Sequence, residues 1–254
     1  MTALPPGCAA GPGGPAFGPG FFGKLPSHGD FVSRELARSF VQPWDHWLQR
    51  GLSTAWSRVG NHWPQLFQDG PLWRFALQAG VCGEAAVAGV LVPSQDRSGR
   101  SFPLSIAAAV PPGADLGLLP VAAAGWFGRL ETLSQRTLAQ GLDADALQHE
   151  LLQIGNVPES SPSSFAAALP GQVGWQVPLP PAPAPALVWP AVVHEMVRLL
   201  EAPFSLWWTL GTATIPPCLL VCPYLPLGEA FIALYDGDWR RWNWDSADTV
   251  LSDP

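Results

Sequence analysis

The stretch 72–110 reads LWRFALQAGVCGEAAVAGVLVPSQDRSGRSFPLSIAAAV and contains three runs with the pattern of β-strands. Within Leu72–Gln78 the two sets of alternating side chains differ in character, as in a strand with two distinct faces. Ala85–Pro93 is almost continuously apolar, which predicts a central strand buried on both faces. Pro103–Val110 is the third strand and follows the polar loop Ser94–Ser101, so a short connection joins the last two.

Helical spacing marks much of the remaining chain. Ser39–Val59 is the clearest helix, because Trp44, Trp47 and further apolar residues recur at three- and four-residue steps. Further helices are predicted at Trp63–Gln68, twice within 115–154, at Leu187–Glu201 and at Leu227–Tyr235, and further strands from Phe21, at 205–210 and at 218–222. Strands and helices alternate only partly, which predicts a single-domain α/β fold whose mixed or antiparallel sheet has helices packed on it.

Composition divides the chain into a folded part, 20–237, and two tails. Residues 1–19 are rich in Gly and Pro without apolar periodicity, which is typical of a disordered tail. Residues 155–185 form a Pro-rich connection, expected to be extended or poorly ordered. Residues 238–254 form an aromatic and then acidic tail that either exposes its aromatic side chains to a partner or folds back on the domain. Its aromatic and basic residues are Trp239, Arg240, Arg241, Trp242 and Trp244.

Charge is scarce in this chain of 254 residues. Only 13% of the residues are charged and the formal net charge is −7, against about 25% charged residues in an average soluble domain. An acidic chain with few cations is unsuited to nucleic acid, which is bound through clustered Lys and Arg. No apolar stretch has the length of a membrane span and no secretory signal is visible, so we expect a cytoplasmic protein with four reduced cysteines.

Searches for catalytic, metal-binding and cofactor-binding patterns find no complete site. Ser27, His28 and Asp30 are the residue types of a hydrolytic triad, but triad members normally converge from separate segments. The segment HEMVR, which starts at His194, has Arg198 where a zinc protease needs its second histidine. The glycines of 17–23 match neither phosphate-binding pattern, and no CxxC pair suggests structural zinc. We therefore predict no catalytic residue, no metal and no cofactor.

The loop PSQDRSGRSFPL, residues 93–104, concentrates charge in a charge-poor chain. Asp96, Arg97 and Arg100 lie within five residues of one another, and Gly99 permits a left-handed turn. Two arginines on one tight loop can bind a carboxylate or phosphate in a bidentate way. In the simpler alternative, Asp96 pairs with one of the arginines inside an ordinary hairpin. The sequence leaves both interpretations open.

An ordered set of irregular motifs resembles the TagF family, also called ImpM, of type VI secretion-associated proteins. The motifs are FFGKLPSHGDFVSREL, SFVQPWDHWLQRGL, WRFALQAGVCG, GVLVPSQDRSGRSFPL and SLWWTLG followed by PPCLLVC, and they span about 20–237. The resemblance implies a sandwich compared with longin or profilin-like folds. It also implies an accessory repressor of secretion-machine assembly that binds a forkhead-associated scaffold protein and is not an enzyme.

Our leading hypothesis is a non-catalytic adaptor that binds this scaffold through the KLPSHGDF turn and the DRSGR loop. The predicted contact residues are Lys24, Ser27, Asp30, Arg34, Asp96, Arg97 and Arg100. The opposing hypothesis is that Asp30 and Asp96 pair with these same arginines and lock the two loops of the fold together. Two other functions stay open, a structural or baseplate-associated subunit of the machine and a hydrolase built on Ser27 and His28.

Overall fold

One twisted sheet organises the protein. The computed structural model describes residues 17–159, 175–178 and 202–246, and within them the sheet has nine strands in the order β2-β1-β5-β4-β3-β7-β8-β6-β9. Neighbouring strands are antiparallel except β6 and β9, which are parallel. The strands are β1 Gly20–Gly23, β2 Val32–Arg34, β3 Trp73–Leu77, β4 Val87–Val92, β5 Leu104–Ala109, β6 Trp175–Pro178, β7 Phe204–Thr209, β8 Cys218–Pro223 and β9 Asp245–Ser246.

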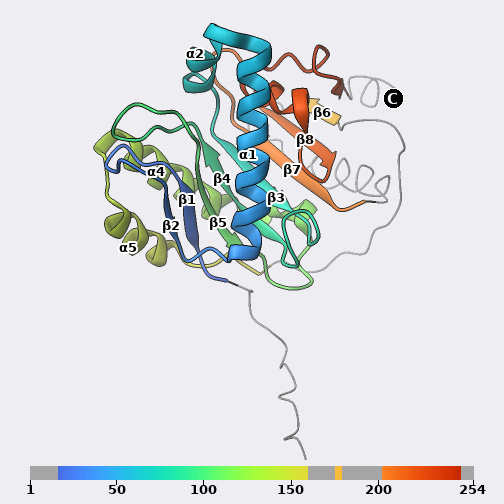
Figure 1. Cartoon of the computed structure of the whole chain (residues 1–254). Coiled ribbons are helices and arrows are strands. Elements are labelled where there is room, and N and C mark those ends of the chain that lie inside the picture. Colours follow the sequence, from blue (N-terminus) through green and yellow to red (C-terminus); the bar gives the residue numbers. More distant parts are fainter. Residues whose placement is uncertain (1–16, 160–174, 179–201, 247–254) are drawn as a thin grey trace, which may run out of the picture.

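Helices cover both faces of the sheet, as Figure 1 shows with α1 on one side and α4 and α5 on the other. The first layer consists of α1 Arg38–Val59, the 3-10 turn η1 Gly60–His62, α2 Trp63–Gln68, the 3-10 turn η3 Gly228–Phe231 and α7 Ala233–Asp236. The second layer consists of the 3-10 turn η2 Leu116–Leu118, α3 Leu119–Ala122, α4 Ala124–Gln140 and α5 Ala144–Ile154. The fold is therefore a mixed α/β domain with a separate apolar core on each face.

Aromatic side chains fill these cores. The indole N–H of Trp44 on α1 donates to Ser105 Oγ on β5 at 2.8 Å, and its ring stacks on Trp207 of β7 with centroids 5.9 Å apart. The neighbouring Trp208 points to the opposite face, where its ring meets Phe127 of α4 edge-on at 4.7 Å. Adjacent tryptophans on one strand thus serve two cores, as the period-two geometry of a strand requires.

The second core also contains an ion pair between β3 and α4. Arg74 donates from Nε and Nη2 to the two carboxylate oxygens of Glu131 at 2.8 and 2.6 Å. The side chains retain only 10% and 16% of their exposure, and the guanidinium lies 6.0 Å from the ring centroid of Phe127. A bidentate pair in this setting fixes where α4 sits on the sheet.

Most of the predicted elements are confirmed. The helix predicted over Ser39–Val59 begins one residue earlier, and the strands predicted within 72–110 are β3, β4 and β5. The first of the two helices expected within 115–154 is interrupted at Ala123, between α3 and α4. The last helix is shorter than expected and is split into η3 and α7. The helix expected at Leu187–Glu201 lies outside the described residues.

The two tails and the Pro-rich connection contain structure that the sequence patterns did not reveal. Phe17 stacks on Phe40 with ring centroids 6.0 Å apart, so ordered packing begins before residue 20. Within the connection 155–185, four residues form β6 and pair with β8. In the C-terminal tail Trp242 and Trp244 are buried in the first core, so the interpretation in which this tail exposes both of them is wrong.

The Arg74–Glu131 pair gives a test of how α4 is held. We expect Glu131→Leu to lower the free energy of unfolding by about 3–5 kcal/mol, because it leaves a buried guanidinium without its partner. The double variant Arg74→Leu/Glu131→Leu should recover most of that loss, since no charge stays buried. Urea denaturation followed by circular dichroism measures both; a double variant no more stable than Glu131→Leu would contradict this account.

Candidate binding surface

Sheet topology brings two loops together. β1 and β4 are both antiparallel to β5, so they run in the same direction and end at the same edge of the sheet. The turn 24–31 follows β1, and the loop 93–103 connects β4 to β5. Gly23 has φ +141°, and a Cβ at this position would collide with the carbonyl oxygen of Pro103. The absence of a side chain at Gly23 thus allows the two segments to touch.

The carboxylate of Asp96 connects the two loops. Lys24 Nζ lies 2.9 Å from Asp96 Oδ2, and Arg100 Nε donates to the same oxygen at 2.7 Å. The backbone N–H groups of Ser98 and Arg100 donate to Asp96 Oδ1 at 2.8 and 3.0 Å. The Asp96 side chain is fully buried and that of Lys24 retains 8% exposure. We call Lys24, Asp96 and Arg100 together the loop lock.

Further hydrogen bonds extend the loop lock across both loops. Lys24 Nζ also donates to the Arg100 carbonyl oxygen at 3.3 Å, and Ser94 Oγ donates to the Lys24 carbonyl oxygen at 2.7 Å. Arg100 Nη2 reaches the carbonyl oxygen of Gly29 at 2.6 Å. The backbone N–H of Arg97 donates to the carbonyl oxygen of His28 at 2.8 Å. The loops therefore form one connected unit.

Two opposing effects set the protonation of Asp96. Burial raises the pKa of a carboxyl, but the hydrogen bonds from Lys24 and from the Arg100 and Ser98 backbone outweigh it, so the pKa of Asp96 lies well below its ordinary value. Asp96 is therefore ionised in the folded protein throughout the physiological pH range. A buried carboxylate with four donors is well satisfied, whereas its loss would leave two cations without their counter-charge.

The seven predicted contact residues separate into inward-facing and outward-facing groups. Lys24 and Asp96 are buried in the loop lock, and Ser27 is half-buried. The exposed members are Asp30, Arg34, Arg97 and Arg100. The two hypotheses for the DRSGR loop are thus compatible, since Asp96 pairs with Arg100 and leaves Arg97 at the surface.

Arg97 differs from the other three exposed members. Asp30 accepts a hydrogen bond from the N–H of Phe31 at 2.8 Å, and Arg34 pairs with Asp145 of α5 at 3.7 Å. Arg100 belongs to the loop lock. Among the residues that the structure describes, the guanidinium of Arg97 has no ion pair and no hydrogen bond. This cation is therefore available to a partner.

Ser27 and His28 lie within hydrogen-bond reach of each other, but the serine proton points elsewhere. Ser27 Oγ lies 3.0 Å from His28 Nδ1 and donates its proton to the carbonyl oxygen of Leu142 at 2.8 Å. Toward His28 the hydroxyl can therefore only accept, whereas a catalytic base must take the serine proton. In the described ranges no third side chain hydrogen-bonds to His28. The pair instead ties the turn to the loop after α4.

Phe31 is a surface residue that the motif analysis did not single out. Its side chain is 45% exposed, its ring meets Phe102 edge-on at 4.7 Å, and Lys24 Nζ lies 5.2 Å from its centroid. Phe31 is the last residue of the KLPSHGDF motif, and the next residue, Val32, is buried at the start of β2. The alternation of buried and exposed side chains in this short strand is the only sequence signal that could have indicated that Phe31 is exposed. The exposed ring adds apolar area beside the loop lock.

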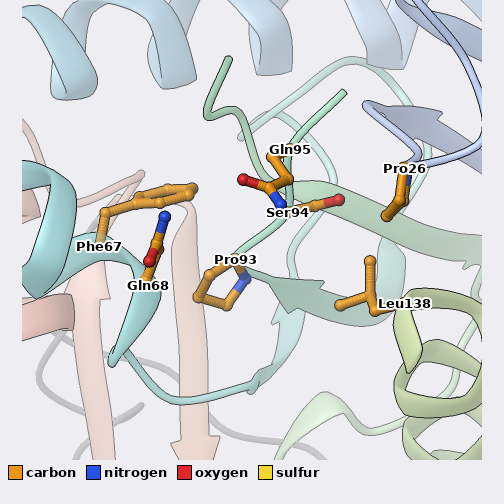
Figure 2. Close-up of a pocket in the computed structure, with 7 residues that line it drawn as sticks. All are labelled: Pro26, Phe67, Gln68, Pro93, Ser94, Gln95 and Leu138. Carbon is orange, nitrogen blue, oxygen red and sulfur yellow. The ribbon is translucent and has the colours of Figure 1, made fainter. Parts of the chain in front are cut away.

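A small pocket opens next to the loops. Its volume is about 220 Å³, and its walls come from the turn after β1, the end of α2, the end of β4 and the C-terminal part of α4 (Figure 2). The lining residues are Pro26, Phe67, Gln68, Pro93, Ser94, Gln95 and Leu138. Phe67 and Leu138 belong to opposite helical layers, so the pocket lies at the end of the sheet between the two layers.

The described cysteines contribute no reactive thiol to this surface. Cys82, Cys218 and Cys222 are buried and free, and burial raises the pKa of each thiol to about 12. In the described ranges no group of three or more His, Cys, Asp or Glu residues could hold a metal ion. None of the helices described combines the length and apolar character that a membrane crossing requires.

Comparison with known proteins identifies the family. The family described as "TagF N-terminal domain, Type VI secretion system-associated" matches residues 20–154, slightly more than half of the chain. The chain belongs to the TagF family. The matched region contains both loops, the complete loop lock and every residue that lines the pocket. The resemblance inferred from the motifs is thereby confirmed, and with it an accessory role associated with type VI secretion.

A solved structure is similar to this chain over more than the region that the family matches. The crystal structure of PA0076 from Pseudomonas aeruginosa PAO1 is similar to this TagF protein, with a TM-score of 0.68 and 35% sequence identity. The alignment covers 87% of this chain and 94% of that chain. An alignment of that extent includes residues after 154. Among curated protein sequences, no match was found.

The lowered pKa of Asp96 predicts a pH-dependent contribution to the stability of this TagF protein. A carboxyl whose folded pKa is depressed stabilises the fold above its unfolded pKa of about 3.9, and this contribution disappears as the pH falls through the folded value. We expect Asp96→Asn to lower the urea midpoint at pH 6. The difference from the natural protein should shrink steadily between pH 4 and pH 2.5.

Urea titrations at several pH values measure this difference, and Asp30→Asn is the matched control because Asp30 is exposed and has no ion pair among the described residues. A deficit of Asp96→Asn that stays constant down to pH 2.5 would contradict the assigned role of the Asp96 charge.

Proposed function

We propose that this TagF protein is a cytoplasmic, non-catalytic regulator that represses assembly of the type VI secretion machine by binding a forkhead-associated scaffold protein. Membership of a type VI secretion-associated family supports the process. The scaffold partner and the repressing effect are what the family resemblance implies. The contact surface consists of Arg100, which is the exposed member of the loop lock, and of four exposed residues around it, Asp30, Phe31, Arg34 and Arg97.

The observation that carries this proposal is the exposed Arg97, which has no partner among the described residues and lies on a loop held by the contacts of the loop lock. In a chain with only 13 Lys and Arg residues, two cations serve the buried Asp96 and a third remains free beside them. Arginine is one of the residues that most often dominate protein interfaces, because its guanidinium binds carboxylates and phosphates in a bidentate way. A loop that is already ordered loses little conformational entropy when it binds.

The absence of catalysis is also part of the proposal. The proton of Ser27 is directed to the Leu142 carbonyl, away from His28. The described thiols are buried, and their pKa values are far above neutrality. We expect the purified protein to hydrolyse p-nitrophenyl acetate no faster than Ser27→Ala does, as measured by absorbance. Loss of a measurable rate in Ser27→Ala would instead support the hydrolase hypothesis.

The direct test is to measure binding of the purified scaffold protein by the natural protein and by a charge-reversed variant. We expect Arg97→Glu to weaken binding at least about thirtyfold, which is the loss of about 2 kcal/mol that defines an interface hot spot. Arg50→Glu is the matched control, because Arg50 is an exposed arginine on α1 in the first helical layer. In the native bacterium Arg97→Glu should also release secretion from repression, measured as effector protein in the medium.

Circular dichroism and the urea midpoint should show that both variants are folded. If folded Arg97→Glu binds the scaffold as tightly as Arg50→Glu, the proposed surface is wrong. If the natural protein does not bind the scaffold at all, the proposed partner is wrong.

A further inference from the structure

The pocket of Figure 2 has the size of one side chain. Its volume of about 220 Å³ lies below the range of about 300–1,000 Å³ that is typical of small-molecule and cofactor sites. Phe67, Pro93 and Leu138 provide apolar walls, and no charged residue contributes to the lining of the described pocket. Such a cavity fits a single apolar group better than a phosphate or a sugar.

Two side-chain amides at this pocket indicate which kind of ligand bears the apolar group. Gln68 and Gln95 are exposed and lie on different walls, one at the end of α2 and the other after β4. Among the described residues neither side-chain amide has a hydrogen-bond partner. An amide offers both a donor and an acceptor, which are the two groups that a peptide backbone presents. A pocket with apolar walls, flanked by two amides that have no partner among the described residues, therefore suits an extended polypeptide.

The charges next to the pocket have opposite signs on the two walls. Arg97 follows Gln95 by two residues, a backbone distance of at most about 7 Å. Asp69 follows Gln68 on the α2 wall and is exposed, with one carboxylate oxygen bound by Gln65 at 2.7 Å. A carboxylate of a bound segment would be attracted to the Arg97 side and repelled from the Asp69 side. These charges therefore favour one orientation of a bound acidic segment, with its carboxylate toward Arg97.

We propose that this pocket receives one apolar side chain of an extended partner segment, with an acidic residue about two positions away that pairs with Arg97. The proposal rests on the proposed function in that the segment belongs to the scaffold protein. The recognised ligand is thus a short peptide segment that carries an apolar side chain and a neighbouring carboxylate. About two residues of extended chain span the distance from the pocket to the Arg97 side.

A random 12-residue peptide library displayed on phage tests this proposal with the full-length protein as bait. We expect the enriched peptides to share a large apolar residue with Asp or Glu within three positions. Synthetic peptides from the selection should lose at least tenfold in affinity for Gln68→Trp, because the indole fills the pocket from the α2 wall. They should lose a similar factor for Arg97→Glu, because the carboxylate then meets a like charge.

Gln65→Trp is the matched control, since it makes the same substitution on the same short helix without lining the pocket. Gln95→Trp fills the pocket from the opposite wall and serves as the second variant if Gln68→Trp does not fold. Enriched peptides without acidic residues, peptides that bind Gln68→Trp and Gln65→Trp equally well, or no enrichment at all would overturn the proposal.

The peptide experiment and the scaffold experiment test the two proposals separately. If the selected peptides bind as expected and the scaffold protein does not, the pocket is a peptide site and the proposed partner is wrong. If the scaffold binds the natural protein and Gln68→Trp equally well, the scaffold interface does not include the pocket, and the proposal that the pocket receives a segment of the scaffold protein is wrong. If the scaffold loses affinity for both Gln68→Trp and Arg97→Glu, the two proposals are supported together.

Discussion

The buried carboxylate of Asp96 is the constraint on which the arrangement of this surface depends. A charge without solvent must be matched by partners, and here Lys24, Arg100 and two backbone N–H groups supply them. Because Lys24 follows β1 and Asp96 follows β4, the ion pairs fix two loops that are distant in the sequence. Those loops then present Arg97 and Phe31 to solvent in a defined position.

Sheet topology explains why the two loops and the pocket lie together. β1 and β4 end at the same edge because both are antiparallel to β5, and α2 leads into β3 at that edge as well. The pocket therefore opens where two helical layers and two loops meet, within the region shared with the TagF family. In the proposed recognition site a preorganised charge lies beside an apolar pocket, and preorganisation lowers the conformational entropy that is lost on binding.

Sequence patterns predicted the elements that have strong local signals. The limits of α1 and β4 follow from helical spacing and a continuous apolar run, and the opposite orientations of Trp207 and Trp208 follow from strand geometry. The charge cluster was located but its pairing was not, because spacing alone cannot choose between Arg97 and Arg100 or reveal Lys24 as the third member. The short strands β2, β6 and β9 depend on pairing with neighbours and carry no periodic pattern of their own.

Amide hydrogen exchange by NMR on the full chain tests the central claim most directly, that one buried charge holds both loops. The N–H groups of His28, Arg97 and Ser98 are hydrogen-bonded within or between the loops. The loop lock predicts that all three are protected in the natural protein and lose protection together in Asp96→Asn, while Val90 in β4 stays protected. Unchanged protection of His28 and Arg97 in that variant would show that the loops hold their positions without Asp96, and would contradict the account.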